Sequence, residues 1–506
     1  MAQGRSLTQV ASIVAVATLL SKGMGLLRQV AIAAVYGVGV AYDAYNYAYV
    51  VPGFLLVLLG GINGPFHSAI VSALAKREPQ EAATIVETVN SLVSVALLLL
   101  AVGLWLGAEG ITDLFAPGLR SGGATGLEIR AIAIEQLRIM TPMAVLAGLI
   151  GVGFGSLNAA NQYWLPAVSP LLSSLAVLGG VGGLVWLLGE RVVLPEYAVL
   201  GGRVLAYSTL AGAVGQWLAQ VWAQWRSGVG SLRLRWQWQH PGVREVLRVM
   251  VPATLSSGTL QINVYTDLFF ASYLPAAASA LGYAGLLVQT PLGILSNVIL
   301  VPLFPVLSRL AAPEDWPQLK ERIRQGLWLT GLFMLPLGAL MMVLARPIVA
   351  LVYERFAFGG EATSLVAAVL VAYSLGMFVY LGRDVLVRVF YALGDGETPF
   401  RISVVNIFLN VLLDAVLVQW LAAPGLVLAT VGVNAFSMVW LMVGLHRRLG
   451  GLDWGGRSLL GLALASGLAA AGSWLCLAGL VVLLPGSVWW IRVVHLAIAG
   501  AVGLGI

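Results

Sequence analysis

Long tracts without a charged residue recur along this chain of 506 residues. Four of them cover residues 91–107, 171–188, 326–345 and 459–485. A helix needs roughly 20 apolar residues to cross about 30 Å of hydrocarbon, and these tracts approach or exceed that length. One soluble core cannot bury so much apolar surface, because 59% of the residues are hydrophobic and only 10% are charged. The tracts therefore predict an all-α integral membrane protein with about fourteen transmembrane helices.

Two apolar segments about 239 residues apart look like copies of one another. The first begins at Pro52 and has a further proline at Pro65, and the second begins at Pro291 and has one at Pro302. Both end on a Ser-x-Leu-Ala sequence. Internal duplication is typical of transporters that expose one site to each side of the membrane in turn. We therefore expect two pseudo-symmetric six-helix lobes, followed by two C-terminal helices outside the repeat.

Polar loops divide the chain and indicate its orientation. We expect a first lobe at residues 1–226, a cytoplasmic linker at 227–242, a second lobe at 243–448, and the two extra helices at 449–506. If the first span starts inside, lysine and arginine concentrate on the cytoplasmic side, which predicts a multi-pass protein of inner-membrane type with a cytoplasmic N-terminus. The last span reaches Ile506 without a polar tail, so we expect either a longer natural chain or a short final helix.

Charge and motifs argue against several other functions. The net charge of +6 comes from basic loops that report orientation and contact with anionic lipid, so nucleic acid is not an expected partner. The single cysteine, Cys476, and the four histidines lack metal-ligand spacing, so we expect no metal and no cofactor. We find no Walker-type phosphate loop and no Ser/His/Asp set, which favours a transporter over an enzyme. The identity of any coupling ion stays open.

Two cations lie inside the first predicted span. A charge in lipid costs at least about 2.5 kcal/mol unless it faces protein or water. Lys22 and Arg28 lie six residues apart, so they project roughly 120° apart around the helix and about 9 Å apart along it. Both can line one aqueous cavity and attract an anionic head group such as a diphosphate. The alternative is that Lys22 snorkels to the surface while Arg28 pairs with a carboxylate as a structural contact.

Two acidic residues, Asp43 and Asp267, are candidates for gating or ion coupling. Asp43 lies where the first outer turn enters the second span, so it is either an N-cap or part of the site. Asp267 occupies the repeat position that corresponds to Arg28. Asp267 and Arg28 could therefore form an ion pair between the lobes, either one that opens and closes or a static one.

Four more candidates lie in the second half of the chain. Arg383, Asp384 and Arg388 fall in the tenth predicted span. Arg383 and Asp384 are adjacent and should not face each other, whereas Asp384 and Arg388 are four apart and can pair on one helix. Asp414 stands alone among apolar residues, as a proton or cation site or as a bond to a neighbouring helix.

Several segments resemble the lipid II flippase family (MurJ/MviN) of the multidrug/oligosaccharidyl-lipid/polysaccharide exporter superfamily. They are residues 21–52, 156–170, 240–267, 353–358 and 387–402, in the family's order. The last, VRVFYALGDGETPFRI, is the most specific. The resemblance implies fourteen helices in two six-helix lobes, with helices thirteen and fourteen forming a lipid-facing groove. It also implies outward movement of the undecaprenyl-diphosphate-linked peptidoglycan precursor by alternating access, with membrane lipids and cell-wall synthesis enzymes as further partners.

The resemblance also assigns individual residues. By motif match, Lys22 and Arg28 stand at two of the family's cavity arginines, and Asp43 stands at an acidic position of the same segment. Val57 falls near the place of the family's Arg-Arg pair, and Leu286 falls where the family has Asp-Arg before a proline. These departures imply a less cationic cavity. The alternatives are therefore another lipid-linked oligosaccharide or amphiphile as substrate, or a transport-inactive membrane scaffold.

Overall fold

The computed structural model describes residues 7–505 apart from 62–63, 75–76, 260–261 and 484–488. Every regular element in this part of the chain is a helix, which confirms the predicted fold class. Eight of these helices are long and apolar enough to cross a membrane. Two shorter helices, Gly123–Met140 and Met143–Ala159, meet at a bend, and the number rises to nine if this pair is counted as one span. The chain is therefore a multi-pass membrane protein, and the count of fourteen crossings stays a prediction.

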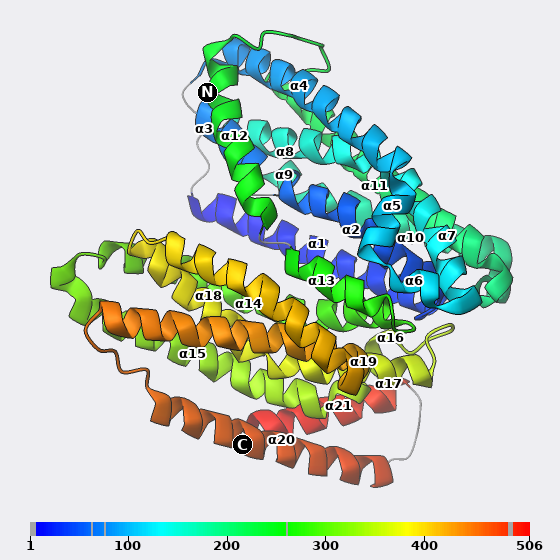
Figure 1. The fold of residues 1–506 in the computed structure, drawn as a ribbon, viewed down its shortest axis with the longest axis vertical. Coiled ribbons are helices and arrows are strands. Elements are labelled where there is room, and N and C mark those ends of the chain that lie inside the picture. The colour runs from blue at the N-terminus through cyan, green and yellow to red at the C-terminus, as the bar shows by residue number, and fades with distance from the viewer. Residues whose placement is uncertain (1–6, 62–63, 75–76, 260–261, 484–488, 506) are drawn as a thin grey trace. The chain divides into compact units, whose positions relative to one another are not determined.

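The helices form two compact units that divide after Ala276. The first unit runs from blue to green in Figure 1 and contains α1 (Leu7–Tyr36), α2 (Val40–Leu58), α3 (Pro65–Leu74), α4 (Pro79–Leu106), α5 (Ala108–Phe115), α6 (Gly118–Ser121), α7 (Gly123–Met140), α8 (Met143–Ala159), α9 (Trp164–Val168), α10 (Pro170–Leu188), η1 (Gly189–Val193), η2 (Pro195–Tyr197), α11 (Ala198–Ser227), α12 (Pro241–Thr259) and α13 (Ile262–Ala271). The second unit contains α14 (Ala277–Arg309), η3 (Pro313–Asp315), α15 (Trp316–Val343), α16 (Ala345–Tyr353), α17 (Gly360–Leu375), α18 (Met377–Ala392), α19 (Glu397–Arg448), α20 (Gly456–Leu483) and α21 (Trp489–Gly505).

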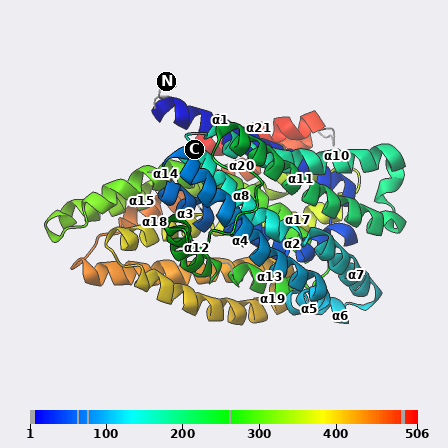
Figure 2. The same ribbon diagram turned by 90° about the horizontal axis from the view of Figure 1, so that it is seen from above.

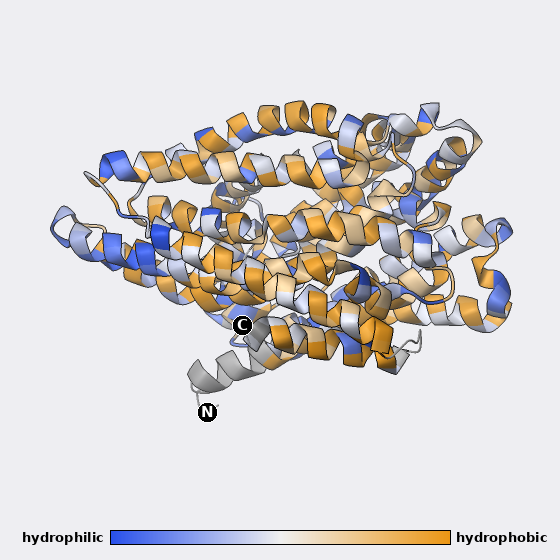
Figure 3. Ribbon diagram, turned by 90° about the horizontal axis from the view of Figure 1, so that it is seen from below, coloured by the Kyte–Doolittle hydropathy of each residue, from blue (hydrophilic) through white to orange (hydrophobic). Residues whose placement is uncertain are grey.

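Hydrophobic residues dominate the middle of the long helices, and hydrophilic residues gather near helix ends and turns (Figure 3). Proline and glycine explain several of those ends. α4 begins with Pro79 in its first turn, where the missing N–H costs no hydrogen bond. α11 ends at Ser227, and Gly228 caps it with a φ of 69°, in the left-handed region that glycine adopts without strain.

α8 lies at the centre of the first unit, where it packs against α2, α3, α4 and α11. Figure 2 shows α8 beside α3 and α4. Its glycines allow this close approach: a Cβ built on Gly151 would lie 2.0 Å from the carbonyl oxygen of Leu59, and one on Gly155 would lie 2.6 Å from Cβ of Ile70. Small residues at helix contacts are typical of membrane bundles, because lipid offers no hydrophobic driving force between helices.

The linker at residues 227–242 is held against α4. Arg235 forms an ion pair with Glu87, with Nε 2.6 Å from Oε2, and its backbone N–H donates to Oγ of Ser91 at 3.0 Å. The hydroxyl of Ser231 donates to the other carboxylate oxygen of Glu87. Glu87 is buried, so this polar cluster ties the linker to one face of α4.

α12 and α13 also belong to the first unit. α12 packs against α3 and α4, and α13 packs against α5 and α6. Nη2 of Arg77 lies 2.8 Å from Oε2 of Glu245, and the ring of Phe54 meets that of Tyr265 edge to face. The repeat assigns these helices to the second lobe, so the compact unit extends past the predicted boundary at residue 243. The boundary concerns sequence duplication and stays a prediction.

In the second unit, α19 is a helical hairpin. It breaks at Ala422, whose φ is 50°, and Pro424 follows the break. Its two ends meet, since Nη1 of Arg448 lies 3.0 Å from Oδ2 of Asp395 beside the start of the helix. α19 has 52 residues, and a straight helix of that length would measure about 78 Å. Because the hydrocarbon core is only about 30 Å thick, the break divides α19 into two spans.

α20 and α21 are the last two helices of the second unit. α20 packs against α15 and α21, and α21 also packs against α16. The hydroxyl of Ser473 donates to the carbonyl of Ala499 at 2.8 Å. Nη2 of Arg492 lies 2.9 Å from Oε1 of Glu354, which follows α16.

Candidate transport site

Lys22 and Arg28 both lie on α1, in the part of the helix whose side chains are described. Lys22 is exposed and Arg28 is partly buried. Among the residues that the structure describes, neither forms an ion pair with an acidic side chain. Two cations without such partners keep their charge available for an anion. The alternative in which Lys22 snorkels and Arg28 pairs with a carboxylate stays a prediction.

A row of tyrosines on α2 lies next to Arg28. The rings of Tyr42 and Tyr45 stack with centroids 6.1 Å apart, and those of Tyr45 and Tyr49 stack at 5.3 Å. The charge of Arg28 acts electrostatically on all three hydroxyls. The Nε2 amide of Gln29 donates to the hydroxyl of Tyr42, which joins α1 to α2 beside the cation.

Neighbouring helices fix this row of tyrosines. The hydroxyl of Tyr45 lies 3.1 Å from Oγ1 of Thr209 on α11. Tyr36, a separate tyrosine at the end of α1, donates its hydroxyl to the carbonyl of Gly201 at 3.1 Å and so joins α1 to α11. Sequence reasoning missed the tyrosines, although their spacing of three and four residues indicates one helix face.

Asp43 is buried in the first turn of α2, 3% exposed. The N-cap of this helix is Gly39, so the alternative that Asp43 caps α2 is wrong. Asp43 is the fourth residue of the helix, and an acid in the first turn is stabilised by the partial positive charge of the helix N-terminus. Its role in gating stays a prediction.

Asp267 lies on α13 and is partly buried. It belongs to the same compact unit as Arg28. The predicted pairing of these two residues stays a prediction.

The charged group on α18 pairs differently from the sequence expectation. Nη1 of Arg383 lies 3.5 Å from Oδ1 of Asp384, and Nε of Arg383 donates to Oγ of Ser437 at 3.2 Å. Arg388 places its guanidinium 5.9 Å from the ring centre of Phe304 instead of pairing with Asp384. An arginine side chain is long enough to reach back to its neighbour, and an aromatic face stabilises the other guanidinium.

Asp414 lies on a buried polar stripe of α19. Asn406, Asn410 and Asp414 follow one another at every fourth residue, and all three are buried. Nδ2 of Asn410 donates to Oδ2 of Asp414 at 2.7 Å. A fully buried carboxylate on a membrane helix is costly unless polar groups surround it, so this stripe is a functional candidate.

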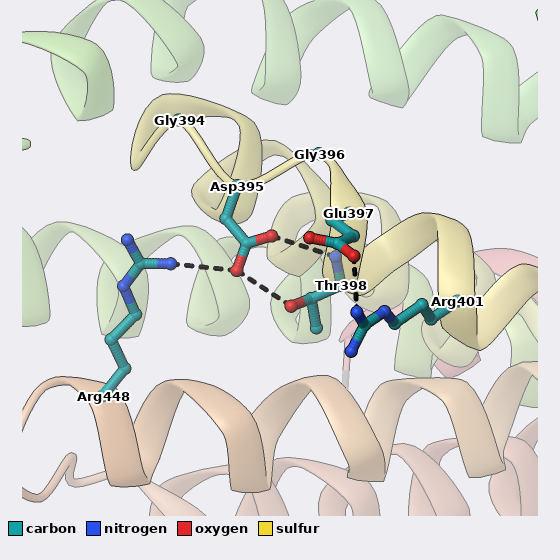
Figure 4. Close-up of a pocket in the computed structure, with 7 residues that line it drawn as sticks. All are labelled: Gly394, Asp395, Gly396, Glu397, Thr398, Arg401 and Arg448. Carbon is teal, nitrogen blue, oxygen red and sulfur yellow. Dashed lines mark hydrogen bonds and ion pairs between the residues drawn. The ribbon is translucent and has the colours of Figure 1, made fainter.

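The segment GDGETP forms a polar pocket of about 320 Å³ where α18 turns into α19 (Figure 4). Oδ1 of Asp395 accepts from the backbone N–H of Thr398 at 2.9 Å, and Oδ2 accepts from its hydroxyl at 2.8 Å. Arg448 bonds to the same carboxylate, and Glu397 pairs with Arg401. Burial alone would raise the pKa of Asp395, but these hydrogen bonds and the Arg448 charge hold it below its usual value. Asp395 lies just before the start of α19 and Arg448 is its last residue, so their ion pair ties the two ends of this helix together.

Solved structures identify the class of this fold. One, titled lipid II flippase MurJ in an inward closed conformation, superposes with a TM-score of 0.76 at 21% identity and covers 97% of each chain. An inward-facing multidrug resistance MATE family transporter of the MOP superfamily gives a TM-score of 0.60 at 17% identity, over 89% of this chain and 96% of that one. The protein therefore has the fold of MOP-superfamily membrane transporters.

Sequence comparison identifies the family within that class. The family profile for lipid II flippase MurJ matches residues 32–498. A probable lipid II flippase MurJ from Synechocystis sp. is 56% identical over 490 residues, which are 96% of this chain and 89% of that protein. A lipid II flippase MurJ from Burkholderia cenocepacia is 28% identical over 443 residues, 85% of this chain and 82% of that protein. The chain belongs to the lipid II flippase MurJ family, which confirms the resemblance seen in its sequence.

Proposed function

We propose that this protein moves lipid II, the undecaprenyl-diphosphate-linked peptidoglycan precursor, outward across the bacterial cytoplasmic membrane. The observation that carries the proposal is family membership, with 56% identity to the Synechocystis protein over 96% of the chain. The distribution of basic loops supports a cytoplasmic N-terminus. Transport of this kind breaks no covalent bond, so we assign no catalytic residue. Cell-wall synthesis enzymes are the partners that would supply and consume the lipid.

Lys22 and Arg28 are the proposed binding residues for the diphosphate. The guanidinium of Arg28 can hold two phosphate oxygens at once, while the ammonium of Lys22 acts as a point charge. The stacked tyrosines of α2 give Arg28 a rigid wall, because Tyr45 is held to α11 by its hydroxyl. Such a wall keeps the cation in place when the site opens to either side by alternating access.

Asp414 is the proposed coupling residue for an ion gradient. It is 0% exposed and accepts a hydrogen bond from Asn410 on the same helix. Binding of a proton or a small cation would neutralise this buried carboxylate and change the stability of its surroundings. We therefore expect Asp414→Asn to make transport insensitive to an imposed ion gradient while leaving substrate binding intact. Asn406→Ala on the same stripe is the matched control that keeps the carboxylate.

Complementation tests the proposal in cells. A strain depleted of its own lipid II flippase should grow when it carries the wild-type chain and should lyse when it carries Arg28→Ala or Lys22→Ala. Arg401→Ala is the control, since Arg401 is exposed at the start of α19 and its ion pair is with Glu397, one turn away on the same helix. Full growth with both cavity variants at wild-type protein levels would favour the scaffold alternative.

Reconstituted vesicles separate lipid II from other substrates. The purified chain should translocate labelled lipid II faster than a lipid-linked oligosaccharide with a different glycan, and Arg28→Ala should abolish this difference. A chain that moves only the other lipid would keep the transporter class and overturn the substrate.

A further inference from the structure

An apolar groove of about 420 Å³ lies in the first unit, and none of its described lining residues belongs to α1. Its walls come from the end of α2, the start of α3, the middle of α4 and the middle of α12. Among the described residues that line it, Thr254 alone has a polar side chain, and its hydroxyl donates to the carbonyl of Met250 at 2.7 Å. The described lining therefore offers a bound molecule hydrocarbon contacts.

Two side chains in the wall of the groove pack against α8. A Cβ on Gly148 of α8 would lie 2.4 Å from Cδ1 of Leu97 and 2.6 Å from Cγ1 of Val93. These two side chains line the groove, so their positions depend on the glycine behind them. Its volume falls within the range of about 300–1,000 Å³ that is usual for ligand pockets.

The groove lies among lipid-facing side chains. On α4, Leu98 is 55% exposed and Leu99 is 70% exposed. On α12, Val249 and Val251 are also exposed. In a multi-pass membrane protein, exposed apolar faces contact lipid, so the mouth of the groove meets the acyl chains of the bilayer.

One end of the groove carries positive charge. Arg244 and Arg248 lie one turn apart on α12, and both are exposed. The guanidinium of Arg244 lies 6.0 Å from the ring centre of Trp238, and exposed tryptophan with arginine is typical of the membrane interface. Their acidic neighbour, Glu245, is paired with Arg77, and no ion pair with an acid is formed by either arginine in the described part of the chain.

We propose that this groove binds one acyl chain of an anionic glycerophospholipid from the cytoplasmic leaflet, with the lipid phosphate at Arg244 and Arg248. Leu247 and Val251 continue the same face of α12 into the groove, so head group and chain meet one continuous surface. The choice of leaflet rests on the proposed orientation of the chain. The proposal does not depend on which lipid the protein transports.

Native mass spectrometry of the full chain tests this site. The protein is reconstituted in vesicles of equal phosphatidylglycerol and phosphatidylcholine, extracted, and examined for retained lipid. We expect retained phosphatidylglycerol in the wild type and about thirtyfold less in the double variant Arg244→Gln/Arg248→Gln, since each basic residue near an anionic surface contributes about fivefold. Arg401→Gln is the matched control and should retain the wild-type amount.

A second pair of variants tests the chain-binding part. Ala96→Phe places a ring in the groove, whereas Leu98→Phe adds bulk to the exposed face of the same helix. We expect loss of retained lipid only in Ala96→Phe. If that variant unfolds at a lower temperature than the wild type, Val251→Phe blocks the groove from α12 instead.

Three results would overturn the proposal. The first is wild-type retention of phosphatidylglycerol by the double arginine variant, and the second is equal retention by the groove-filling variant and Leu98→Phe. The third is displacement of the phospholipid by an equal amount of undecaprenyl phosphate, which would assign the groove to a polyisoprenoid chain. Lipid II translocation is measured separately, so failure of transport and failure of this site are distinguishable.

Discussion

Close packing of α8 against the α2–α3 region gives a sharp prediction for Gly151→Ala. The added Cβ would lie 2.0 Å from the carbonyl oxygen of Leu59 and 3.0 Å from Cβ of Phe66. The first contact is to backbone, which cannot rotate away, so the helices must separate by at least about 1 Å. Overpacking of this kind costs about 1–3 kcal/mol of folding free energy.

Gly103→Ala is the matched control for this experiment. Gly103 lies within α4, and a Cβ there meets nothing within 4 Å. Alanine is the better helix former, so this change should be neutral or should stabilise the protein by up to about 1 kcal/mol.

Unfolding in mixed micelles of increasing sodium dodecyl sulfate, followed by circular dichroism, gives the stability of each variant. We expect the unfolding midpoint of Gly151→Ala to fall and that of Gly103→Ala to stay or rise. Equal midpoints for the two variants would refute the close approach of α8 to the end of α2. A lower midpoint for Gly103→Ala alone would show that α4 packs differently from the structure.

Three further predictions concern polar contacts. Glu87→Gln removes the charge that holds Arg235. Trypsin should then cleave the linker at a lower protease concentration than in the wild type. Unchanged cleavage would mean that the ion pair does not hold the linker. Because the folded pKa of Asp395 lies below its unfolded value, its contribution to stability is complete above about pH 5 and is lost as the pH falls below 4. Asp395→Asn should flatten this acid limb, and Arg448→Gln should shift it toward higher pH, as measured by unfolding midpoints across pH; an identical limb in all three proteins would contradict the assignment. Tyr45→Phe removes the hydroxyl bond to α11, which should cost about 1 kcal/mol and slow lipid II translocation in vesicles, and wild-type values for both would exclude a positioning role.

Much of the fold was predictable because lipid imposes simple rules. Long uncharged tracts can satisfy their backbone in hydrocarbon only as helices, and the described residues contain no other regular element. The division into compact units was less accessible. α12 and α13 pack with the first unit although the repeat assigns them to the second lobe, because duplication records sequence ancestry while packing depends on side-chain contacts between helices.

The candidate site was predictable in part. Lys22 and Arg28 stand out in the sequence because charge within an apolar span requires a reason. The partners of such charges did not follow from spacing: Asp384 pairs with the adjacent Arg383, and Arg388 meets the ring of Phe304 on another helix. Helix spacing specifies which residues can meet on one helix, but long arginine side chains have several partners within reach.

The sequence by itself determined the solvent, the helical class and the family, since hydropathy, charge placement and motifs are properties of short segments that lipid and ancestry constrain directly. Only the tertiary structure decided which side chains surround Arg28, how α19 folds back at Ala422, and where the groove between α4 and α12 opens. Those features join residues that are far apart in the chain. Their geometry depends on close packing between helices, which no local sequence pattern specifies.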